Sequence, residues 1–465
     1  MPAVTSQSIV DWCKKLMGIG PGAPQLGLEE YLAAMPGLDT LADLPKGTAV
    51  LIRGDVDAKP GPTVGDGDIR LRSMVETLKY GQAKGWKQIV FGHIGRKPEG
   101  SLNKVQKRLG ELLGCEISLI GDWLDDATGK IKPELSDAVA KAAPGSIILL
   151  ENTRKYGLET VLWKAKEKDL EGLAPRLATL CNELSEKVAK VYVHEALSAG
   201  SLDTSSVVVP AGMDRVALGK YIAGQFHGPM LRCRNAELVV FSGLKTDKLD
   251  DLSAIVERGK VKMVITAGSL AMALLKADGR ISGKNVSLGV AEDPAHADKP
   301  YYIDPSRIDQ AQKILETGRK HGAEFVLPVD YVLADGSVAD KLGPTDQQFD
   351  VGPKSSDHFG KEVDKFIAKS KASPTPLVAF HNGVFGMFED ARFENGTKRF
   401  TSELKKMKDA GLEVYVGGGE GGAAVDKYGQ PDWITHCFTA GGTVLNALGA
   451  EPIPYLQALY LAVKR

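Results

Sequence analysis

Residues 414–425 have the sequence Val-Tyr-Val-Gly-Gly-Gly-Glu-Gly-Gly-Ala-Ala-Val, a glycine-rich turn between two regular elements. The β-branched and aromatic start is typical of a buried strand, and the alanine-rich end favours a helix. Such a turn binds anions, because backbone N–H groups converge there and the helix dipole favours negative charge. Glu420 would repel a bare phosphate, so its position indicates Mg2+ carrying the phosphate. The alternative is a glycine turn that only redirects the chain.

Composition limits the classes of protein that fit. A chain of 465 residues predicts two domains. A formal net charge of -1 gives no overall field for nucleic acid or an anionic membrane, so we expect neither as a partner. The five cysteines are scattered without CxxC spacing, which indicates neither disulfides nor zinc. With no apolar run of ~18–20 residues and no secretory signal pattern, we expect a cytoplasmic protein.

The first half of the chain alternates short apolar runs with helical patterns. Helices are predicted at 70–83, at about 102–113 and over much of 162–187, and strands at 49–52, 88–91, 117–120, 146–150 and 190–193. This alternation indicates a parallel sheet covered on both faces.

Polar side chains follow these strands, and in open α/β sheets ligands bind beyond the carboxyl ends of the strands. We therefore predict that they share one edge of the sheet. Each alone could be an ordinary loop residue, but several cationic side chains at equivalent positions argue against coincidence. The residues are Asp55, Asp57, His93, Arg96, Arg154 and Glu195.

The pattern restarts in the second half, with strands predicted at 237–241, 261–265, 324–328, 377–380, 414–416 and 434–438. These strands end in glycines, accompanied by Lys245, Lys248 and the carboxylates Glu389 and Glu420. A basic crevice suits a phosphorylated or carboxylated small molecule held by arginine forks. A glycine-and-carboxylate crevice suits a nucleotide with Mg2+. The two crevices together indicate phosphoryl transfer, which needs in-line placement and charge neutralisation.

The predicted fold class is α/β, with two Rossmann-like parallel-sheet domains and a central interdomain cleft. The predicted divisions are an N-terminal extension packed on the first domain (1–45), an acid-substrate domain (46–211), a connector helix (212–228), a nucleotide-binding domain (229–438) and a C-terminal segment (439–465). For the C-terminal segment, a return to the first domain is an open alternative.

Nine features, in order along the chain, resemble those of the phosphoglycerate kinase family. Arg70 lies at the position of its catalytic arginine. The other eight are R-x-D-x-N at 53–57, S-H-L-G-R at 92–96, E-N-x-R at 151–154, G-A-K-V-S-D-K (one residue short) at 243–248, D-I-G-P-K at 350–354, N-G-P-M-G-V-F-E at 382–389, G-G-G-D-T-A-A-A at 417–424 and T-G-G-G at 439–442.

The resemblance implies roles for particular residues. Arg70 would also meet the moving phosphoryl group, Lys248 would neutralise it, and Lys245 would lie close by. The residues implied to hold 3-phosphoglycerate are Asp55, Asp57, Arg70, His93, Arg96 and Arg154; those implied for ATP or ADP are Lys248, Asn382, Glu389, Gly418, Gly419, Glu420 and Gly421, with Glu420 near Mg2+. Structural alternatives are a solvated Lys245, a turn-supporting Asn382 and a helix-capping Glu389.

The chain departs from the family pattern in the acid site. The family sequence H-R-A-H-A-S aligns with residues 201–206, Ser-Leu-Asp-Thr-Ser-Ser, so Leu202 replaces a substrate-binding arginine and both histidines are lost. One lost charge-assisted contact costs roughly 1.5–3 kcal/mol, or about 10- to 150-fold in affinity. Asp57 replaces asparagine, Glu420-Gly421 replaces Asp-Thr and Ala440 replaces glycine. Three lysines lie nearby in the sequence and are open candidates for compensating the lost charge: Lys59, Lys97 and Lys155.

Three functions stay open at this point. The resemblance implies a cytoplasmic, monomeric, glycolytic transferase that moves a phosphoryl group reversibly between 1,3-bisphosphoglycerate and ADP with Mg2+. Leu202 and Asp57 favour a kinase of another carboxylate or acyl phosphate. The altered acid site and the residues 1–45 also fit a nucleotide-binding regulator without turnover.

Overall fold

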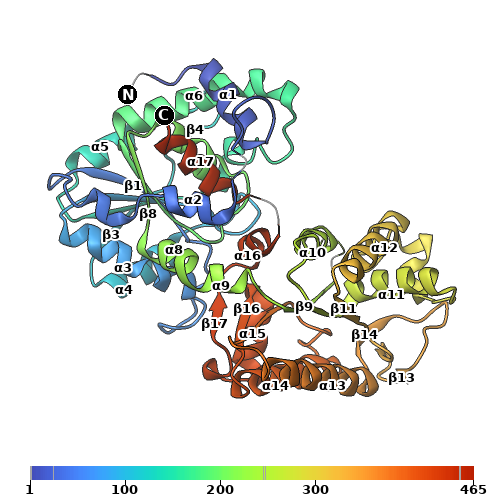
Figure 1. Ribbon diagram of the computed structural model, residues 1–465. Helices are drawn as coiled ribbons and strands as arrows, with labels where there is room; N and C mark the ends of the chain where they lie inside the picture. Colours follow the sequence, from blue (N-terminus) through green and yellow to red (C-terminus); the bar gives the residue numbers. More distant parts are fainter. Residues whose placement is uncertain (1–2, 25, 245, 247, 450–451) are drawn as a thin grey trace. The chain divides into compact units, whose positions relative to one another are not determined.

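The computed structural model describes residues 3–24, 26–244, 246, 248–449 and 452–465. The chain forms two compact units. Unit 1 contains the chain up to Gly228 together with Pro452–Arg465, and unit 2 begins at Pro229. Figure 1 shows the last helix, α17 (Pro454–Val463), among the N-terminal elements of unit 1.

Unit 1 is built on a six-stranded, all-parallel sheet in the order β3-β6-β2-β1-β7-β8. Its strands are β1 (Ala49–Gly54), β2 (Lys87–Phe91), β3 (Ile117–Ile120), β6 (Ile147–Leu150), β7 (Val191–Glu195) and β8 (Arg215–Leu218). Its helices are α1 (Ser6–Leu16), α2 (Leu28–Ala34), α3 (Ile69–Ala83), α4 (Asn103–Leu113), α5 (Pro133–Lys141), α6 (Leu170–Lys187), α7 (Thr204–Val207) and α8 (Lys220–Gln225), with α17. A small hairpin joins β4 (Leu124–Asp125) to β5 (Lys130–Ile131).

Helices cover both faces of this sheet, with α3 and α4 on one side and α6 and α17 on the other (Figure 1). The apolar strand residues are therefore buried from both sides, which is why the central strands have almost no polar alternation. Val50, Ile52, Val90 and Leu149 share one core cluster with apolar residues of α3 and α4.

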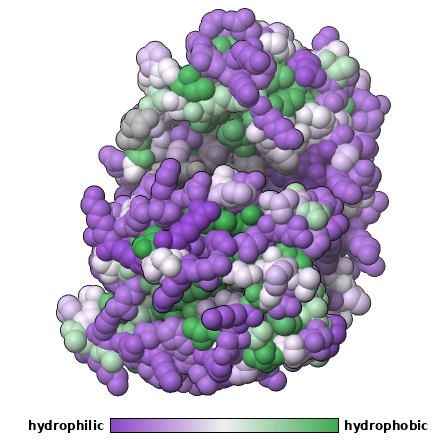
Figure 2. Space-filling model, turned by 90° about the vertical axis from the view of Figure 1, so that its right-hand side faces the viewer, coloured by the Kyte–Doolittle hydropathy of each residue, from purple (hydrophilic) through white to green (hydrophobic). Residues whose placement is uncertain are grey.

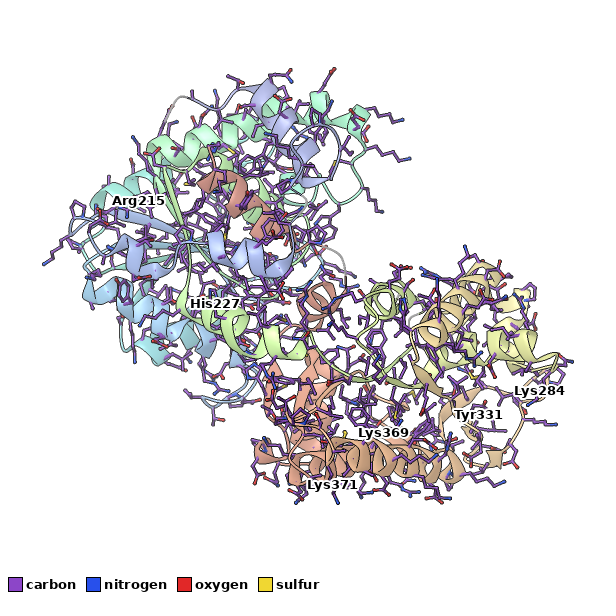
Figure 3. The ribbon with its side chains drawn as sticks, viewed as in Figure 1. Arg215, His227, Lys284, Tyr331, Lys369 and Lys371 are labelled. Atoms are coloured by element: carbon purple, nitrogen blue, oxygen red, sulfur yellow. The ribbon has the colours of Figure 1, made fainter. Side chains whose placement is uncertain are left out.

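Unit 2 repeats this architecture, with the sheet order β11-β10-β9-β15-β16-β17 and parallel pairing throughout. Its strands are β9 (Leu238–Gly243), β10 (Met263–Ala267), β11 (Glu324–Val326), β15 (Val378–Asn382), β16 (Glu413–Gly417) and β17 (His436–Phe438). Its helices are α9 (Leu231–Cys233), α10 (Lys248–Glu257), α11 (Gly268–Ser282), α12 (Pro305–Lys320), α13 (Pro353–Ser370), α14 (Asn395–Asp409), α15 (Gly418–Tyr428) and α16 (Gly441–Leu448). A small antiparallel sheet contains β12 (Tyr331–Leu333), β13 (Val338–Ala339) and β14 (Gln348–Val351); Figure 3 labels Tyr331. The predicted fold class of two parallel-sheet α/β domains is thus confirmed.

The range predicted as a connector helix, 212–228, requires a correction. Its first part is the strand β8, which pairs with β7 at the edge of the sheet. Arg215, labelled in Figure 3, begins β8 and makes an ion pair with Asp43 at 2.9 Å. Helix starts only at Lys220, because Gly219 is extended and caps α8. The helix predicted over much of 162–187 is α6, which begins at Leu170.

Residues 452–465 pack within unit 1, whereas α16 belongs to unit 2. The ring of Tyr455 stacks on His194 at 4.1 Å, and the Arg465 guanidinium lies 5.2 Å from the ring of Trp12 in α1. Arg465 also donates to the carbonyl of Pro210 at 3.0 Å. The C-terminal residues and the first helix therefore pack together in unit 1.

The face in Figure 2 is largely hydrophilic, with hydrophobic residues scattered among polar ones. In the part of the chain that the structure describes, no helix combines the length and apolar character needed to cross a membrane.

Candidate functional site

At the end of β1 in unit 1, two carboxylates meet Arg70, which lies in the first turn of α3. The Asp57 carboxylate accepts hydrogen bonds from Arg70 Nη1 at 2.7 Å and from the Gly95 N–H at 2.8 Å. Arg70 Nε lies 3.9 Å from Asp55 Oδ1. Asp55 is fully buried and accepts from Ser198 Oγ at 2.6 Å. Burial raises the pKa of Asp55, while Arg70 opposes that shift.

His93 follows β2 and is held as a neutral side chain. Arg53 Nη2 lies 2.8 Å from His93 Nδ1, and arginine has no acceptor, so Nδ1 accepts this hydrogen bond. Burial lowers the pKa of His93 well below its usual value, and the charges of Arg53, Arg154 and Arg70 add to the effect. The remaining proton therefore lies on Nε2, 3.9 Å from Asp57 Oδ2. The Nε2–H group is a donor at this edge of the sheet.

A third carboxylate, Asp203, lies among the basic side chains and had no predicted role. It is fully buried at the start of α7 and accepts a hydrogen bond from Trp163 Nε1 at 2.9 Å. Arg154 Nη2 lies 3.4 Å and Arg53 Nη2 3.6 Å from Asp203 Oδ2. His93 Nδ1 is 3.5 Å away, but the neutral ring makes no ion pair. The Arg154 guanidinium also stacks over Trp163, 4.8 Å from the ring centre.

The predicted strand-end group is therefore only partly assembled. Arg96 is exposed and makes no side-chain hydrogen bond or ion pair with the other described residues. Lys59 and Lys97 are exposed, and Lys155 Nζ donates to the carbonyl of Gly121. The residues brought together are Asp55, Asp57, Arg70, His93 and Arg154, which with Arg53 and Asp203 we call the acid-site cluster.

Glu195, the last predicted strand-end residue, has a structural position instead. Its buried carboxylate accepts from Thr77 Oγ1 at 2.5 Å and from the N–H groups of Tyr221 at 3.0 Å and Ile222 at 3.1 Å. Glu195 thus caps the first turn of α8. Burial raises the pKa of this carboxyl to about 7, although the hydrogen bonds oppose the shift.

Glu195 should make the stability of unit 1 depend on pH. Because its pKa is raised on folding, the native protein keeps a proton that the unfolded chain loses between about pH 4.5 and 7. The free energy of unfolding should therefore fall by up to about 3 kcal/mol over that window. In Glu195→Gln, which cannot titrate, this part of the decrease should vanish. Urea unfolding at pH 5 and pH 8, followed by tryptophan fluorescence, measures the difference.

Tryptophan fluorescence suits this test because four of the five tryptophans, all except Trp433, lie in unit 1. The exposed Glu116 provides the control, and Glu116→Gln should keep the wild-type pH profile. Identical pH profiles for wild type and Glu195→Gln would show that Glu195 does not carry the effect.

In unit 2 the carboxyl ends of four strands have glycines with left-handed backbone angles. Their φ values are +147° at Gly243, +67° at Gly268, +96° at Gly383 and +86° at Gly418. A Cβ at Gly383 would lie 2.1 Å from the carbonyl oxygen of Ser242, and one at Gly268 would lie 2.7 Å from that of Gly243. The neighbouring strand ends approach so closely that only glycine fits.

Lys248 and Asn382 connect this edge to the glycine-rich segment. Lys248 Nζ donates to the Ser242 carbonyl at 2.8 Å and to Asn382 Oδ1 at 3.2 Å. Asn382 Nδ2 donates to the Gly417 carbonyl at 2.9 Å. Asn382 therefore supports the turn, which was the structural alternative to nucleotide binding. Lys245, the other predicted catalytic lysine, lies outside the described residues.

The glycine run itself forms the first turn of α15, which begins at Gly418. Gly418, Gly419, Glu420 and Gly421 therefore all lie at a helix N-terminus, where backbone N–H groups have no helical partner. Glycine costs about 1 kcal/mol relative to alanine at a helix position. Such a glycine-rich start suits an anion that approaches the backbone closely.

A cavity of about 330 Å³ opens at this edge and has both predicted carboxylates in its wall. Glu389 and Glu420 are exposed there beside Gly243 and Gly268. The apolar part of the wall contains Met272, Leu288, Tyr301, Phe349 and Met387. Its volume falls in the range of small-molecule sites, roughly 300–1,000 Å³. Asp390, not Glu389, caps the next helical turn.

The donor set fits Mg2+ only as a companion of a phosphate ligand. Among the described residues, no group of three or more His, Cys, Asp or Glu side chains could hold a metal ion. Mg2+ usually takes one or two carboxylates and completes its shell with water and substrate phosphates. Glu420, exposed at the N-terminus of α15, meets that requirement.

Comparison with known proteins gives one consistent family. A profile described as phosphoglycerate kinase matches residues 41–451. Phosphoglycerate kinase of Clostridium botulinum (strain Alaska E43 / Type E3) is 30% identical over 432 residues, covering 90% of this chain and 98% of the relative. The cytosolic phosphoglycerate kinase of Nicotiana tabacum is 28% identical over 432 residues, with 90% and 96% covered. The solved phosphoglycerate kinase of Pyrococcus horikoshii OT3 has the same fold, with a TM-score of 0.70, 21% identity, and 92% and 100% covered.

Proposed function

Because this chain belongs to the phosphoglycerate kinase family, a family of kinases, we propose that it transfers a phosphoryl group reversibly between 1,3-bisphosphoglycerate and ADP, giving 3-phosphoglycerate and ATP. The observation that carries the proposal is the acid-site cluster, in which Arg70, His93 and Arg154 meet at one sheet edge. We expect a weaker acid site than the family motif implies, because Leu202 stands at the position of an arginine.

In unit 1, the acid-site cluster holds the acid. Arg70 is anchored by two hydrogen bonds to Asp57 and keeps 23% of its side chain exposed, which presents positive charge to a bound anion. His93 donates a hydrogen bond through its Nε2–H group and stays neutral, so it orients the ligand without adding charge. Arg154 supplies a second guanidinium.

In unit 2, the cavity takes the nucleotide, with its phosphates toward the first turn of α15. Asn382 positions the Lys248 ammonium, which neutralises charge on the transferring group. Glu420 would hold Mg2+ together with those phosphates, and the ion would supply further charge neutralisation when bound.

The chemistry needs no covalent help from the chain. In the direction of ATP formation, an anionic oxygen of the ADP β-phosphate attacks the phosphorus of the acyl phosphate. The bond from that phosphorus to the acyl oxygen breaks, and the carboxylate leaves with its electron pair. The residues contribute placement and electrostatic stabilisation, which dominate catalysis of phosphoryl transfer.

A coupled assay with purified protein, ATP, Mg2+ and 3-phosphoglycerate tests the proposal. We expect measurable turnover that Lys248→Ala abolishes, because the variant removes the ammonium group near the transferring phosphate. Lys260→Ala, at an exposed position of the same unit, should retain wild-type turnover. Nucleotide binding without turnover on any acid would instead support a non-catalytic regulator.

A further inference from the structure

The acid-site cluster already contains the negative charge that an anionic substrate would bring. Asp203 is completely buried within 3.4–3.6 Å of Arg154 and Arg53. Asp57 lies 2.7 Å from Arg70. Each arginine of the cluster therefore has a carboxylate from the same chain beside it.

Two residues of this cluster region differ in charge from the family motif. At the position of Asp203, the family motif H-R-A-H-A-S has an uncharged alanine, and at Leu202 it has an arginine. Relative to that motif, the cluster has gained a buried negative charge and lost a positive one, at consecutive residues. Two changes of the same electrostatic sign disfavour a multiply charged anion.

We propose that Asp203 is an internal counterion that determines specificity, so that the proposed kinase uses 3-phosphoglycerate weakly and prefers a small carboxylic acid whose second polar group is uncharged. This rests on the proposed kinase function. The cluster has three arginines and three aspartates, with His93 neutral, so one carboxylate is the anion that it can hold without strong repulsion. A phosphate on the same acid would compete with Asp203 for Arg154.

The side chains around Asp203 fit such an acid. Trp163 is 40% exposed, and its indole N–H is committed to Asp203, so it offers an aromatic surface. Leu202 is half-buried beside it in sequence. The Arg154 Nε is buried and has no hydrogen-bond partner among the described residues, so this guanidinium has donor capacity left for a ligand.

The implied reaction balances without a further reactant. A carboxylate oxygen of the acid attacks the γ-phosphorus of ATP, and the bond between that phosphorus and the oxygen bridging to the β-phosphate breaks. The products are an acyl phosphate and ADP.

Two acids that differ only by a phosphate test the proposal, namely glycerate and 3-phosphoglycerate. Calorimetry measures the binding of each to the full-length protein, and the coupled assay measures turnover. The wild type should bind glycerate roughly tenfold more tightly than 3-phosphoglycerate. Asp203→Asn keeps an oxygen for Trp163 but removes the charge, so it should shift this ratio toward 3-phosphoglycerate by roughly tenfold.

Two further variants make the result decisive. Leu202→Arg adds a cation without altering Asp203 and should shift the ratio in the same direction. Asp122→Asn removes an exposed carboxylate that pairs with Lys132 and should leave the ratio unchanged. Unfolding curves show whether each variant is folded.

The two proposals fail in different ways. The counterion proposal is overturned if the wild type prefers 3-phosphoglycerate, or if Asp203→Asn leaves the ratio of the two affinities unchanged. Either result leaves the proposed kinase function intact. Absence of turnover with both acids, while Asp203→Asn still shifts the binding ratio, overturns the kinase function and supports the counterion.

Discussion

Arg70→Ala should lower kcat by about 10²- to 10³-fold, equivalent to roughly 3–4 kcal/mol of transition-state stabilisation. The reason is geometric, because Asp57 fixes the Arg70 guanidinium through Nη1 beside the buried Asp55. A guanidinium held in place before the reaction stabilises charge that develops on the transferring phosphoryl group without reorganising. Steady-state kinetics in both reactants separate the loss in kcat from a change in KM.

Arg72→Ala is the matched control, since Arg72 lies two residues along the same helix. Its side chain is 45% exposed and pairs with Asp68 at 2.8 Å, apart from the acid-site cluster. This variant should stay within about twofold of wild type, as a surface ion pair contributes little. If Arg70→Ala raised only KM for the acid, Arg70 would bind the ground state and transition state equally.

The sequence was sufficient for the two sheets because their signal is local. Short apolar strands bounded by glycine and separated by helical patterns predict a parallel α/β arrangement directly. The strand β8 was not predicted, because its sequence carries no clear local signal. Arg215–Leu218 has only three apolar residues, and a run this short does not distinguish a strand from a helix. Its strand conformation depends on pairing with β7.

The acid-site cluster combines residues that local sequence patterns predict with one residue that they do not. His93 and Arg154 were predicted from their places after strands, and the structure brings them together. Asp203 was not predicted, because its partners come from three separate segments of unit 1, and such contacts leave no spacing in the sequence. The one local signal was an aspartate before Thr204, typical of a helix N-cap.

Arg96 was predicted in this cluster but is exposed, and the backbone before it explains the difference. Gly95 has a φ of +65°, its N–H donates to Asp57, and its carbonyl accepts from Arg154 at 2.5 Å. The cluster thus uses the backbone of Gly95 and turns the chain at that residue. Sequence position after a strand could not reveal a turn that depends on these contacts.

Gly383→Ala should lower the stability of unit 2 by about 3 kcal/mol and weaken nucleotide binding by roughly tenfold or more. The added Cβ would meet the Ser242 carbonyl oxygen at 2.1 Å, and the residue would keep an unfavourable φ of +96°. The ends of β15 and β9 must then separate. That movement displaces Asn382, which holds both Lys248 and the Gly417 carbonyl. Thermal unfolding by circular dichroism and calorimetry with ATP measure the two effects.

Gly411→Ala separates the cost of the close approach from that of the backbone angle. Gly411 has a similar φ of +88°, but a Cβ there would meet nothing within 4 Å. Its replacement should cost only the left-handed penalty of about 1–2 kcal/mol and leave ATP affinity unchanged. If the two variants lost equal stability and both bound ATP as the wild type does, the strand ends would tolerate a side chain. The glycine edge would then not be shaped by the approach of neighbouring strands, and Asn382 would not need its present position for nucleotide binding.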